Sequence, residues 1–432
     1  MRFSETWESL NSREIPEWYD NAKLGIFIHW GIYSVPAYAP KGQYAEWYGW
    51  NAFNGQAGYE AHHKRVYGEN FCYNDFAPMW KAEMFDAGKW AKLFKRAGAK
   101  YVVLVSKHHD AFCLWKSRYS TNWNSVDIGP KRDFVHELFE AVREQGMKPG
   151  VYYSLYEWYH PLLTEKKPEE YADAKMIPEM KELVNAYRPS ILYTDGEWDY
   201  TSEEWHSKEF LAWLFNESVV KDEIVVNDRW GKDCRGVNGG YLSCEYGEVN
   251  SGALDEETAQ KNLMGRKWEE TRSTGMSFGA NRNEEAEDYL KEDELIELLV
   301  KTVSKGGNLL LNVGPNADGT IMPLVEERLI QLGDWLKVNG EAIYDTAFAG
   351  LSLSEGAYAT KKGDKTYVIF RLEPDKKVFI QKMKVRSAKV LGHDAALKIE
   401  NTSEGCEIQA ELKNPILRGS GFITVEIDGE AL

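Results

Sequence analysis

Cysteine is scarce in this chain: five occur in 432 residues, and no two of them form a CxxC motif. Neither a zinc ribbon nor a framework of disulfides is therefore indicated. Long apolar runs are also missing, since no segment reaches the ~18 uninterrupted apolar residues of a transmembrane helix. The amino-terminal segment is polar and charged, without the apolar stretch of a secretory signal. We expect a cytoplasmic protein, or a secreted or periplasmic one whose signal has been removed.

Positive charge is in deficit as well. The chain has 52 Lys and Arg against 68 Asp and Glu, a net charge of −16. Binding to nucleic acid depends on the neutralisation of phosphates, so a chain this acidic is a poor candidate for it. An anionic membrane surface would repel the chain for the same reason. We expect neither a nucleic-acid partner nor a membrane partner, and we ascribe the charge to solubility.

Short apolar or β-branched runs recur along the first part of the chain, with amphipathic helical stretches between them. Runs of this length fit strands that are buried on both faces, as in parallel sheets. The predicted strands are Gly25–Trp30, Tyr101–Ser106, Gly150–Ser154, Ile191–Asp195, Glu223–Asp228, Tyr241–Tyr246, Met276–Gly279 and Asn308–Val313. The alternation predicts an α/β fold, a (β/α)8-like TIM barrel over residues 1–346. An open doubly wound sheet would give the same alternation.

The hydrophobic pattern of the sequence changes after residue 346. Short segments of alternating polar and apolar residues, such as Thr366–Arg371 and Gly421–Ile427, are separated by turn residues at close spacing. This pattern is typical of antiparallel sheets. Residues 347–432 are therefore predicted to form a small carboxyl-terminal antiparallel β-sandwich.

Aromatic side chains make up 13% of the chain and include 16 tryptophans. Two explanations are open: the rings fill the core, or they stack on the C–H faces of sugars. Several tryptophans favour the second explanation, because each lies within a few residues of a predicted strand end. They are Trp30, Trp158, Trp198 and Trp230. We predict that Trp198 contributes to a substrate-binding mouth.

Polar side chains that can carry chemistry stand at the same strand ends. His29 ends the first predicted strand, Asp195 ends the fourth, and Glu245 lies near the end of the sixth. In a barrel, the reactive groups lie at these carboxyl-terminal ends. Glycoside hydrolysis requires one ionised and one protonated carboxyl group, with groups that hold hydroxyls around them. A metal site formed by His29, His108 and Asp110 is the alternative, but no cage of carboxylates or thiolates accompanies it.

Four long motifs stand out: KLGIFIHWGIYSVPAYAPKGQYAEWY (Lys23–Tyr48), KHHDAFCLWKSRYSTNWNS (Lys107–Ser125), GVYYSLYEW (Gly150–Trp158) and VSKGGNLLLNVGPNADGTI (Val303–Ile321). Together they resemble the α-L-fucosidases of glycoside hydrolase family 29. The resemblance implies a (β/α)8-like barrel, a carboxyl-terminal β-sandwich and a retaining mechanism. It also implies an exo-acting enzyme that removes terminal α-L-fucosyl residues from glycans or small fucosides through a covalent intermediate. We expect neither a metal nor a cofactor.

Position by position, the resemblance assigns roles to residues of this chain. Asp195 matches the nucleophile. The residues that match ligands of the sugar are His29, Glu46, Trp47, His108, His109, Tyr153 and Arg229. The residues that match an apolar wall against the methyl group of fucose are Phe27, Tyr44 and Phe278. Tyr152 is the alternative to Tyr153, because successive residues of a strand point to opposite faces.

The acid/base is open between three glutamates. Glu245 and Glu248 lie in the segment GGYLSCEYGE, and Glu269 lies in KWEE. We predict Glu245, with Glu269 and then Glu248 as alternatives. In a retaining enzyme, the acid/base has its carboxyl group ~5–5.5 Å from that of the nucleophile.

Other functions remain open on the sequence alone. They are a glycosidase of a related sugar such as galactose, a catalytically inactive fucose-binding protein, and a metal-dependent hydrolase. The linkage and the aglycone depend on loops around the mouth, which the sequence does not define. A homo-oligomer is compatible with the sequence, which does not determine the oligomeric state.

Overall fold

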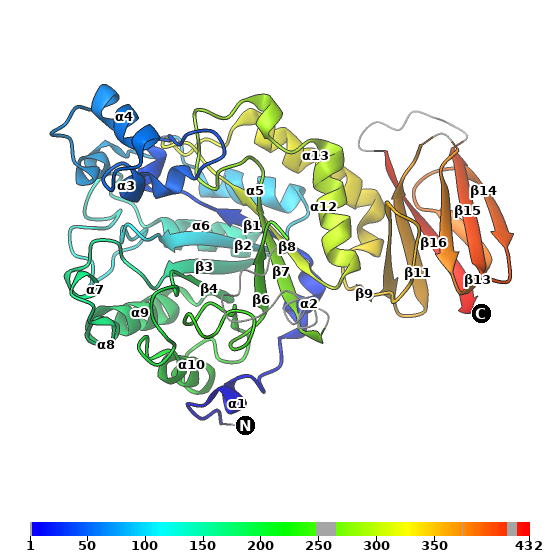
Figure 1. Cartoon of the computed structure of the whole chain (residues 1–432), viewed down its shortest axis with the longest axis horizontal. Coiled ribbons are helices and arrows are strands. Elements are labelled where there is room, and N and C mark those ends of the chain that lie inside the picture. Colours follow the sequence, from blue (N-terminus) through cyan, green and yellow to red (C-terminus); the bar gives the residue numbers. More distant parts are fainter. Residues whose placement is uncertain (1, 248–264, 374, 413–420) are drawn as a thin grey trace.

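The structure is a computed structural model that describes residues 2–247, 265–373, 375–412 and 421–432. Its larger part is a curled sheet of eight parallel strands with helices around the outside (Figure 1). Two antiparallel sheets, of five and three strands, follow toward the carboxyl terminus. The predicted fold class, a (β/α)8-like barrel followed by an antiparallel β-sandwich, is confirmed.

The strands of the barrel follow one another in the order β5-β4-β3-β2-β1-β8-β7-β6. They are β1 Leu24–Ile28, β2 Tyr101–Lys107, β3 Lys148–Ser154, β4 Ile191–Asp195, β5 Val225–Val226, β6 Leu242–Glu245, β7 Trp268–Ser273 and β8 Asn308–Val313. Their apolar side chains alternate between the inside of the barrel and the helix layer. On β2, Tyr101 and Val103 belong to the inner cluster, and Val102 and Leu104 belong to the outer one.

Helices cover the outer face of the sheet. Two of them, α5 (Ala87–Arg96) and α6 (Phe134–Glu144), are capped at their amino-terminal ends by Asp86 and Asp133. Each carboxylate accepts a hydrogen bond of 2.9 Å from the backbone N–H three residues on, which satisfies an amide left free by the first turn. In the described ranges, the other α-helices are α1 Trp7–Leu10, α2 Glu17–Ala22, α3 Tyr48–Asn51, α4 Ala57–Val66, α7 Pro161–Thr164, α8 Pro168–Tyr171, α9 Ile177–Tyr187, α10 Ser207–Asn216, α12 Glu292–Ser304 and α13 Pro323–Asn339. The short 3₁₀-helices are η1 Ile32–Ser34, η2 Ala45–Trp47, η3 Tyr73–Met79, η5 Ala286–Asp288 and η6 Gly340–Ala342, and η4 Ala172–Met176 is a π-helical turn.

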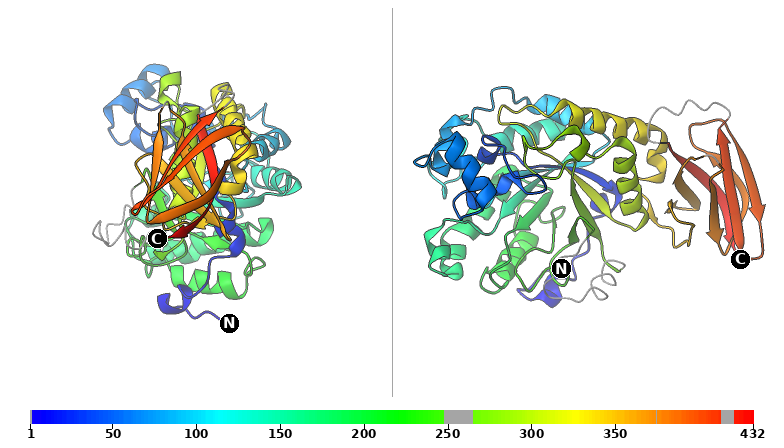
Figure 2. Two further views of the ribbon diagram at one scale, coloured as in Figure 1. Left: turned by 90° about the vertical axis from the view of Figure 1, so that its right-hand side faces the viewer. Right: turned by 45° about the horizontal axis from the view of Figure 1, so that its top comes forward.

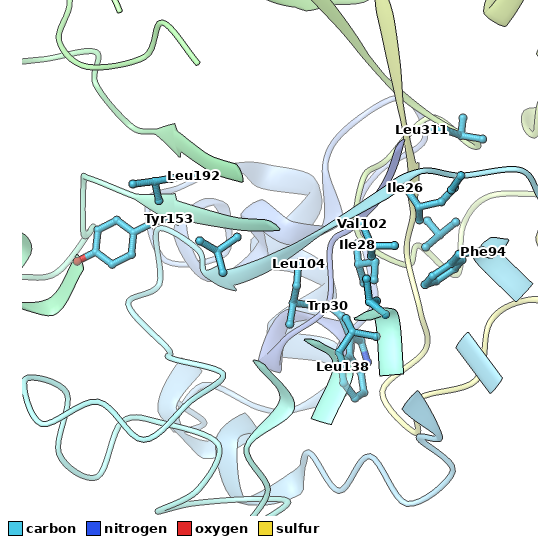
Figure 3. Close-up of a cluster of buried hydrophobic side chains, with 14 of the residues drawn as sticks. Ile26, Ile28, Trp30, Phe94, Val102, Leu104, Leu138, Tyr153, Leu192 and Leu311 are labelled. Atoms are coloured by element: carbon cyan, nitrogen blue, oxygen red, sulfur yellow. The ribbon is translucent and has the colours of Figure 1, made fainter. Parts of the chain in front are cut away.

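The outer apolar layer joins the strands to these helices. Val102 and Leu104 of β2 lie in one buried cluster with Phe94 of α5 and Leu138 of α6 (Figure 3). Each fully buried aliphatic side chain of this kind contributes about 1.5–3 kcal/mol. The strands are thus held between two apolar layers, which leaves their carboxyl-terminal ends as the place for polar groups.

The barrel closes between β5 and β6. Among the described residues, one parallel bridge joins the two strands, from Asn227 after β5 to Tyr241 before β6. The Gly240 amide donates to Asn227 O at 2.9 Å, and the Tyr241 amide donates to Val226 O at 3.1 Å. A Cβ atom on Gly240 would lie 1.7 Å from Val226 O, so only glycine allows this close approach.

The seventh strand differs from the prediction. β7 is Trp268–Ser273, whereas the predicted strand Met276–Gly279 lies in the loop that follows it. The sequence of β7 is WEETRS, and its charged residues hide the apolar pattern by which a buried strand is recognised. Glu269, one of these residues, is buried inside the barrel.

The five-stranded antiparallel sheet packs against α12 and α13, which lie between it and the barrel strands (Figures 1 and 2). The Trp335 indole of α13 donates to Phe422 O at 3.0 Å, and Tyr358 donates to Glu297 of α12 at 2.6 Å. The order of the strands is β13-β16-β11-β10-β9 in one sheet and β12-β15-β14 in the other. Their bounds are β9 Ala347–Phe348, β10 Ala357–Lys362, β11 Lys365–Arg371, β12 Lys377–Gln381, β13 Met383–Val390, β14 Ala395–Asn401, β15 Gly405–Leu412 and β16 Phe422–Ala431. The segment between α13 and β9 contains the position at which the sequence predicts the domain boundary.

Replacing Gly240 with alanine should destabilise the protein by about 3 kcal/mol, because the new methyl group collides with backbone and not with a movable side chain. Urea denaturation measures this change in the free energy of unfolding. Gly265→Ala is the matched control, since no atom of the described residues lies within 4 Å of a Cβ atom built at that position. Equal stability of the two variants would contradict the close approach of β5 and β6.

Candidate active site

A pocket opens at the carboxyl-terminal ends of the barrel strands. The lining residues that the sequence predicts are Phe27, His29, Tyr44, Glu46, Trp47, His108, His109, Asp195, Trp198, Arg229, Glu245 and Phe278. The lining is completed by Tyr152, Tyr193, Arg235 and Thr271. Residues far apart in the sequence meet here because the ends of parallel strands share one rim of the barrel.

Arg229 connects two carboxylates in the pocket. Its Nη1 donates to Asp195 Oδ1 at 2.7 Å, and its Nη2 donates to Glu245 Oε1. The guanidinium is itself oriented by Ser243, whose Oγ accepts from Nε at 3.0 Å and donates to Asp228 Oδ1 at 2.6 Å. Because a planar guanidinium fixes the directions of its donors, it also fixes how Asp195 and Glu245 lie relative to each other.

The Asp195 carboxyl group is ionised near pH 7. Burial alone would raise its pKa, but the positive charge of Arg229 lowers the pKa to about 2. Tyr152 donates its hydroxyl to Asp195 Oδ2 at 2.8 Å and thereby holds the second oxygen. A buried, ionised and oriented carboxylate of this kind can act as a nucleophile or as a general base.

His109 presents an acceptor nitrogen to the pocket. Ser154 Oγ donates to Tyr156 O at 2.5 Å, so it must accept the proton of His109 Nδ1 in the 2.5 Å hydrogen bond between them. Nε2 then carries the lone pair, 3.7 Å from Asp195 Oδ2. Burial lowers the pKa of His109 to about 4, so the ring is neutral near pH 7. A neutral Nε2 accepts a hydrogen bond from a hydroxyl group, which a protonated ring cannot do.

His29 has the same arrangement after β1. Its Nδ1 lies 2.7 Å from Asn312 Oδ1, and the Asn312 amide nitrogen donates to Phe278 O at 2.7 Å. The oxygen of Asn312 is therefore the acceptor, and His29 Nδ1 carries the proton. Burial lowers the pKa of His29 to about 4 and also lowers that of His108. The pocket thus holds neutral histidines, and the Nδ1 hydrogen bonds of His29 and His109 leave Nε2 of both rings unprotonated.

Glu46 and Trp47 belong to η2 in the loop after β1. Glu46 Oε2 accepts from the Gly279 amide at 2.8 Å and from Ser277 Oγ at 3.2 Å, which ties this loop to the loop after β7. Burial raises the pKa of Glu46 to about 7. The Trp47 ring lies 5.6 Å from that of Trp198, so two loops contribute a joint aromatic face.

An apolar wall flanks His29. The ring centroids of Phe27 and Phe278 lie 4.5 Å and 4.9 Å from the centroid of His29. Tyr44 lies 5.7 Å from Phe278, at the mouth of the pocket. Polar acceptors and an apolar patch therefore stand side by side, as a ligand with both hydroxyl and methyl groups requires.

The structure corrects one assignment: Tyr152 lines the pocket, and Tyr153 does not. Side chains alternate along β3, so Tyr152 belongs to the inner cluster and Tyr153 to the outer one (Figure 3). The Tyr153 hydroxyl donates to Glu179 of α9 at 2.8 Å. Two adjacent tyrosines satisfy the same motif, and only the phase of the strand decides which one reaches the ligand.

Tyr153 belongs to a buried network of charges behind the pocket. Lys107 Nζ lies 2.6 Å from Glu157 Oε1 and 3.4 Å from Glu179 Oε2. Lys175 Nζ lies 3.0 Å from the same oxygen of Glu157. Burial would raise the pKa of Glu179, but the two lysines and nearby hydroxyl donors lower it to about 2. The network thus consists of ionised groups that compensate one another.

This network, called the lysine–glutamate network below, lies next to two pocket loops in the sequence. Lys107 directly precedes His108, and Glu157 directly precedes Trp158. The Trp158 amide donates to His109 O at 2.9 Å. The network therefore holds the backbone of the loops after β2 and β3 next to His108 and His109.

Glu245 is the candidate acid that lines the pocket. Glu269 lies at the start of β7, toward the opposite end of the barrel, where Tyr19 and Tyr101 donate to its Oε2 at 2.7 Å and 2.5 Å. Burial raises the pKa of Glu269 to about 7, although it is remote from the strand ends. Glu248 lies outside the described residues.

Some residues of the site were missed by the sequence reasoning. Tyr193 could have been found, because it shares a strand face with Asp195, two residues later. Thr271 was hidden because β7 was not recognised, and Arg235 stands in a loop without any periodic signal. Glu197 is also buried beside the site, where burial raises its pKa to about 7, and its Oε2 has no hydrogen-bond partner among the described residues.

Two further findings concern metal ions and membranes. In the described ranges, no three His, Cys, Asp or Glu side chains are grouped so that they could hold a metal ion. The Asp110 carboxylate accepts instead from the Tyr73 hydroxyl at 2.8 Å and from the Phe112 amide at 3.0 Å. Within the same ranges, no helix has the length and apolar character needed to cross a bilayer.

The chain is similar to known proteins over most of its length. A family model described as alpha-L-fucosidase matches residues 1–341. The tissue alpha-L-fucosidase of Rattus norvegicus is 46% identical over 349 residues, which cover 79% of this chain and 72% of that protein. The tissue alpha-L-fucosidase of Homo sapiens is 43% identical over 384 residues, which cover 87% of this chain and 79% of that protein. The crystal structure of the Thermotoga maritima alpha-fucosidase in complex with fucose has a TM-score of 0.82 at 38% identity, over 99% of this chain and 100% of that one.

Replacing Lys107 with methionine should destabilise the protein by about 3–5 kcal/mol, because two buried carboxylates would then be compensated by Lys175 alone. Urea denaturation at pH 7 measures the loss. The double variant Lys107→Met/Glu157→Gln should recover part of it, since a charge is removed together with its partner. Strictly additive losses in the single and double variants would show that the two residues are not coupled.

Proposed function

Because this chain belongs to the α-L-fucosidases of glycoside hydrolase family 29, we propose that it is a retaining exo-α-L-fucosidase. As a member of that family it is a glycoside hydrolase. Its substrates are then terminal α-L-fucosyl residues of glycans or of small fucosides. The observation that carries the proposal is the pair Asp195 and Glu245, joined by Arg229 in one pocket. Glycoside hydrolysis by a double displacement needs two such carboxyl groups with different roles.

The lining of the pocket supports fucose as the sugar. The unprotonated nitrogens of His29 and His109 can accept hydrogen bonds from ring hydroxyls. Phe27 and Phe278 supply an apolar surface for the methyl group on C5, where galactose has an additional hydroxyl group. An apolar pocket rejects such a hydroxyl group by only about 10²-fold, so the ligands of the ring hydroxyls must supply the remaining selectivity.

In the first step, a carboxylate oxygen of Asp195 attacks the anomeric carbon. The bond from that carbon to the leaving oxygen breaks, and Glu245 gives its proton to the leaving oxygen. The products are a fucosyl ester of Asp195, the aglycone alcohol and an ionised Glu245. Arg229 lies beside both carboxyl groups, and its positive charge compensates the negative charge as it passes from Asp195 to Glu245.

In the second step, the Glu245 carboxylate takes a proton from water, and the water oxygen attacks the anomeric carbon. The ester bond to Asp195 breaks, which regenerates the ionised Asp195 and the protonated Glu245. Two inversions at the same carbon give net retention. The low pKa of Asp195 favours this step as well, because a weakly basic carboxylate is a good leaving group.

Two other functions make different demands on the same residues. A galactosidase would have to place a hydroxymethyl group against the wall of Phe27 and Phe278, which offers that group no hydrogen-bond partner. A catalytically inactive fucose-binding protein would not need an ionised Asp195 held beside a second carboxyl group. Hydrolysis of an aryl α-L-fucoside, with aryl β-D-galactoside as the competing substrate, separates these functions from the proposed one.

Asp195→Gly should lower kcat for an aryl α-L-fucoside by at least about 10³-fold, because the nucleophile is lost. Sodium azide should restore turnover, since the small anion fits the space of the missing carboxylate and attacks the same carbon to give β-L-fucosyl azide. Steady-state kinetics and NMR of the product measure both effects. Asp199→Asn, an exposed carboxylate on the same loop, is the control and should retain the wild-type rate. Full activity of Asp195→Gly would exclude Asp195 as the nucleophile.

Glu245→Gln should reduce kcat/KM for methyl α-L-fucoside by about 10²–10⁴-fold, because its alkoxide leaving group needs a proton. The loss for α-L-fucosyl fluoride should be within about tenfold, since fluoride leaves without a proton. Glu269→Gln is the matched comparison and should show no such dependence on the leaving group. The reverse pattern in the two variants would assign the acid/base role to Glu269.

A further inference from the structure

A row of aromatic rings leads out of the pocket along the loops after β3 and β4. Trp198 is 38% exposed, although its ring packs on His109 at 4.8 Å. Its further neighbours are Trp47, at 5.6 Å, and Tyr156, at 6.5 Å, whose ring lies nearly parallel to that of Tyr200, also at 6.5 Å. Trp198, Tyr156 and Tyr200 are called the aromatic ledge below. Only Trp198 reaches the pocket, so the other two rings extend the aromatic surface beyond the space for one sugar.

The two tyrosines of the ledge are not held in place by hydrogen bonds of their hydroxyl groups. Neither the Tyr156 nor the Tyr200 hydroxyl forms a hydrogen bond to any part of the chain that the structure describes. Both side chains are half-buried and lie at the surface. Tyr152, inside the pocket, by contrast donates its hydroxyl to Asp195. The ledge therefore offers ring faces and free hydroxyls to the solvent next to the pocket.

Arg235 adds unused donors on the same side. It lies in the loop after β5 and lines the pocket, and its Nη2 is 3.9 Å from Glu245 Oε1. Its Nε and Nη2 are buried and have no hydrogen-bond partner in the described residues. A buried donor without a partner is energetically unfavourable. Acceptor oxygens of a ligand at this position would remove that penalty.

The ledge and Arg235 belong to one wall. The Lys232 amide donates to Tyr200 O at 2.9 Å, and the Ser202 amide donates to Asp233 Oδ1 at 2.7 Å. The loop after β4, which carries Trp198 and Tyr200, is thus bonded to the loop after β5, which carries Arg235. A preformed wall of this kind binds a ligand without first having to be ordered.

We propose that the aromatic ledge and Arg235 form an acceptor subsite that holds the sugar ring attached to the departing oxygen. The inference rests on the proposed function, in which Glu245 protonates that oxygen, because Arg235 stands beside Glu245. The C–H face of the ring stacks on Tyr156 and Trp198, and its hydroxyl oxygens accept from Arg235. The preferred substrates are therefore fucosylated oligosaccharides with at least one further sugar, and simple alkyl fucosides are poorer ones.

The test compares a fucosyl disaccharide with methyl α-L-fucoside, since both need a protonated leaving oxygen and only the first has a second ring. The wild type should have the higher kcat/KM for the disaccharide, by about tenfold. Tyr156→Ala should lower the ratio of the two kcat/KM values by about three- to tenfold, the range of one aromatic contact. Tyr156→Phe keeps the ring and should restore the ratio, and Arg235→Gln should lower it. Phe348→Ala, an exposed ring on β9, is the control and should leave the ratio at the wild-type value.

The outcomes separate the subsite from the reaction. If the wild type hydrolyses neither fucoside, the proposed function fails. If it hydrolyses both but does not prefer the disaccharide, or if Tyr156→Ala and Arg235→Gln leave the ratio unchanged, the subsite is overturned and the proposed function stands. A lowered ratio in Tyr246→Ala, with an unchanged ratio in Tyr156→Ala, would overturn it too, because the aglycone would then leave along the wall formed by β6.

Discussion

The site depends on the double ion pair of Arg229. One guanidinium binds carboxylates from the ends of two strands, Asp195 on β4 and Glu245 on β6, and is itself fixed by Ser243 on β6. Between β4 and β6 lies β5, a strand of two residues, after which the arginine emerges. The ion pair therefore links the ends of β4 and β6 by side chains, in the part of the barrel where the backbone hydrogen bonding between strands is shortest. The same contact lowers the pKa of one carboxyl group and sets the direction of both.

The remaining charges are arranged so that they leave this pair undisturbed. The histidines of the pocket are neutral because burial lowers their pKa, so they add no positive charge to compete with Arg229. The ionised groups behind β2 and β3 compensate one another within the lysine–glutamate network. A neutral sugar needs no electrostatic steering to such a pocket, which agrees with a net charge of −16 that serves solubility.

The sequence predicted the fold where hydrophobic patterning is strong. β4 and β8 were predicted with their observed bounds, because ILYTD and NLLLNV are short buried runs. β7 was missed because its interior glutamate is paired with tyrosines inside the barrel, a tertiary contact that no local pattern reveals. The choice between Tyr152 and Tyr153 depends on which of the two side chains of β3 faces the inside of the barrel. Two identical neighbouring residues do not reveal this in the sequence. Arg235 was missed for a simpler reason: loop residues carry no period, and only the fold brings this one to the pocket.

The closure of the barrel has a consequence for how the molecule loses activity. β5 and β6 meet at the bridge from Asn227 to Tyr241, and Asp195 and Glu245 stand on either side of this junction. Local opening begins where few backbone hydrogen bonds have to break, so this seam can part while the helices and the other strands stay folded. The separation of the two carboxylates would change with the first such fluctuation. Catalysis is thus a more sensitive reporter of the integrity of the seam than any signal that averages over the whole fold.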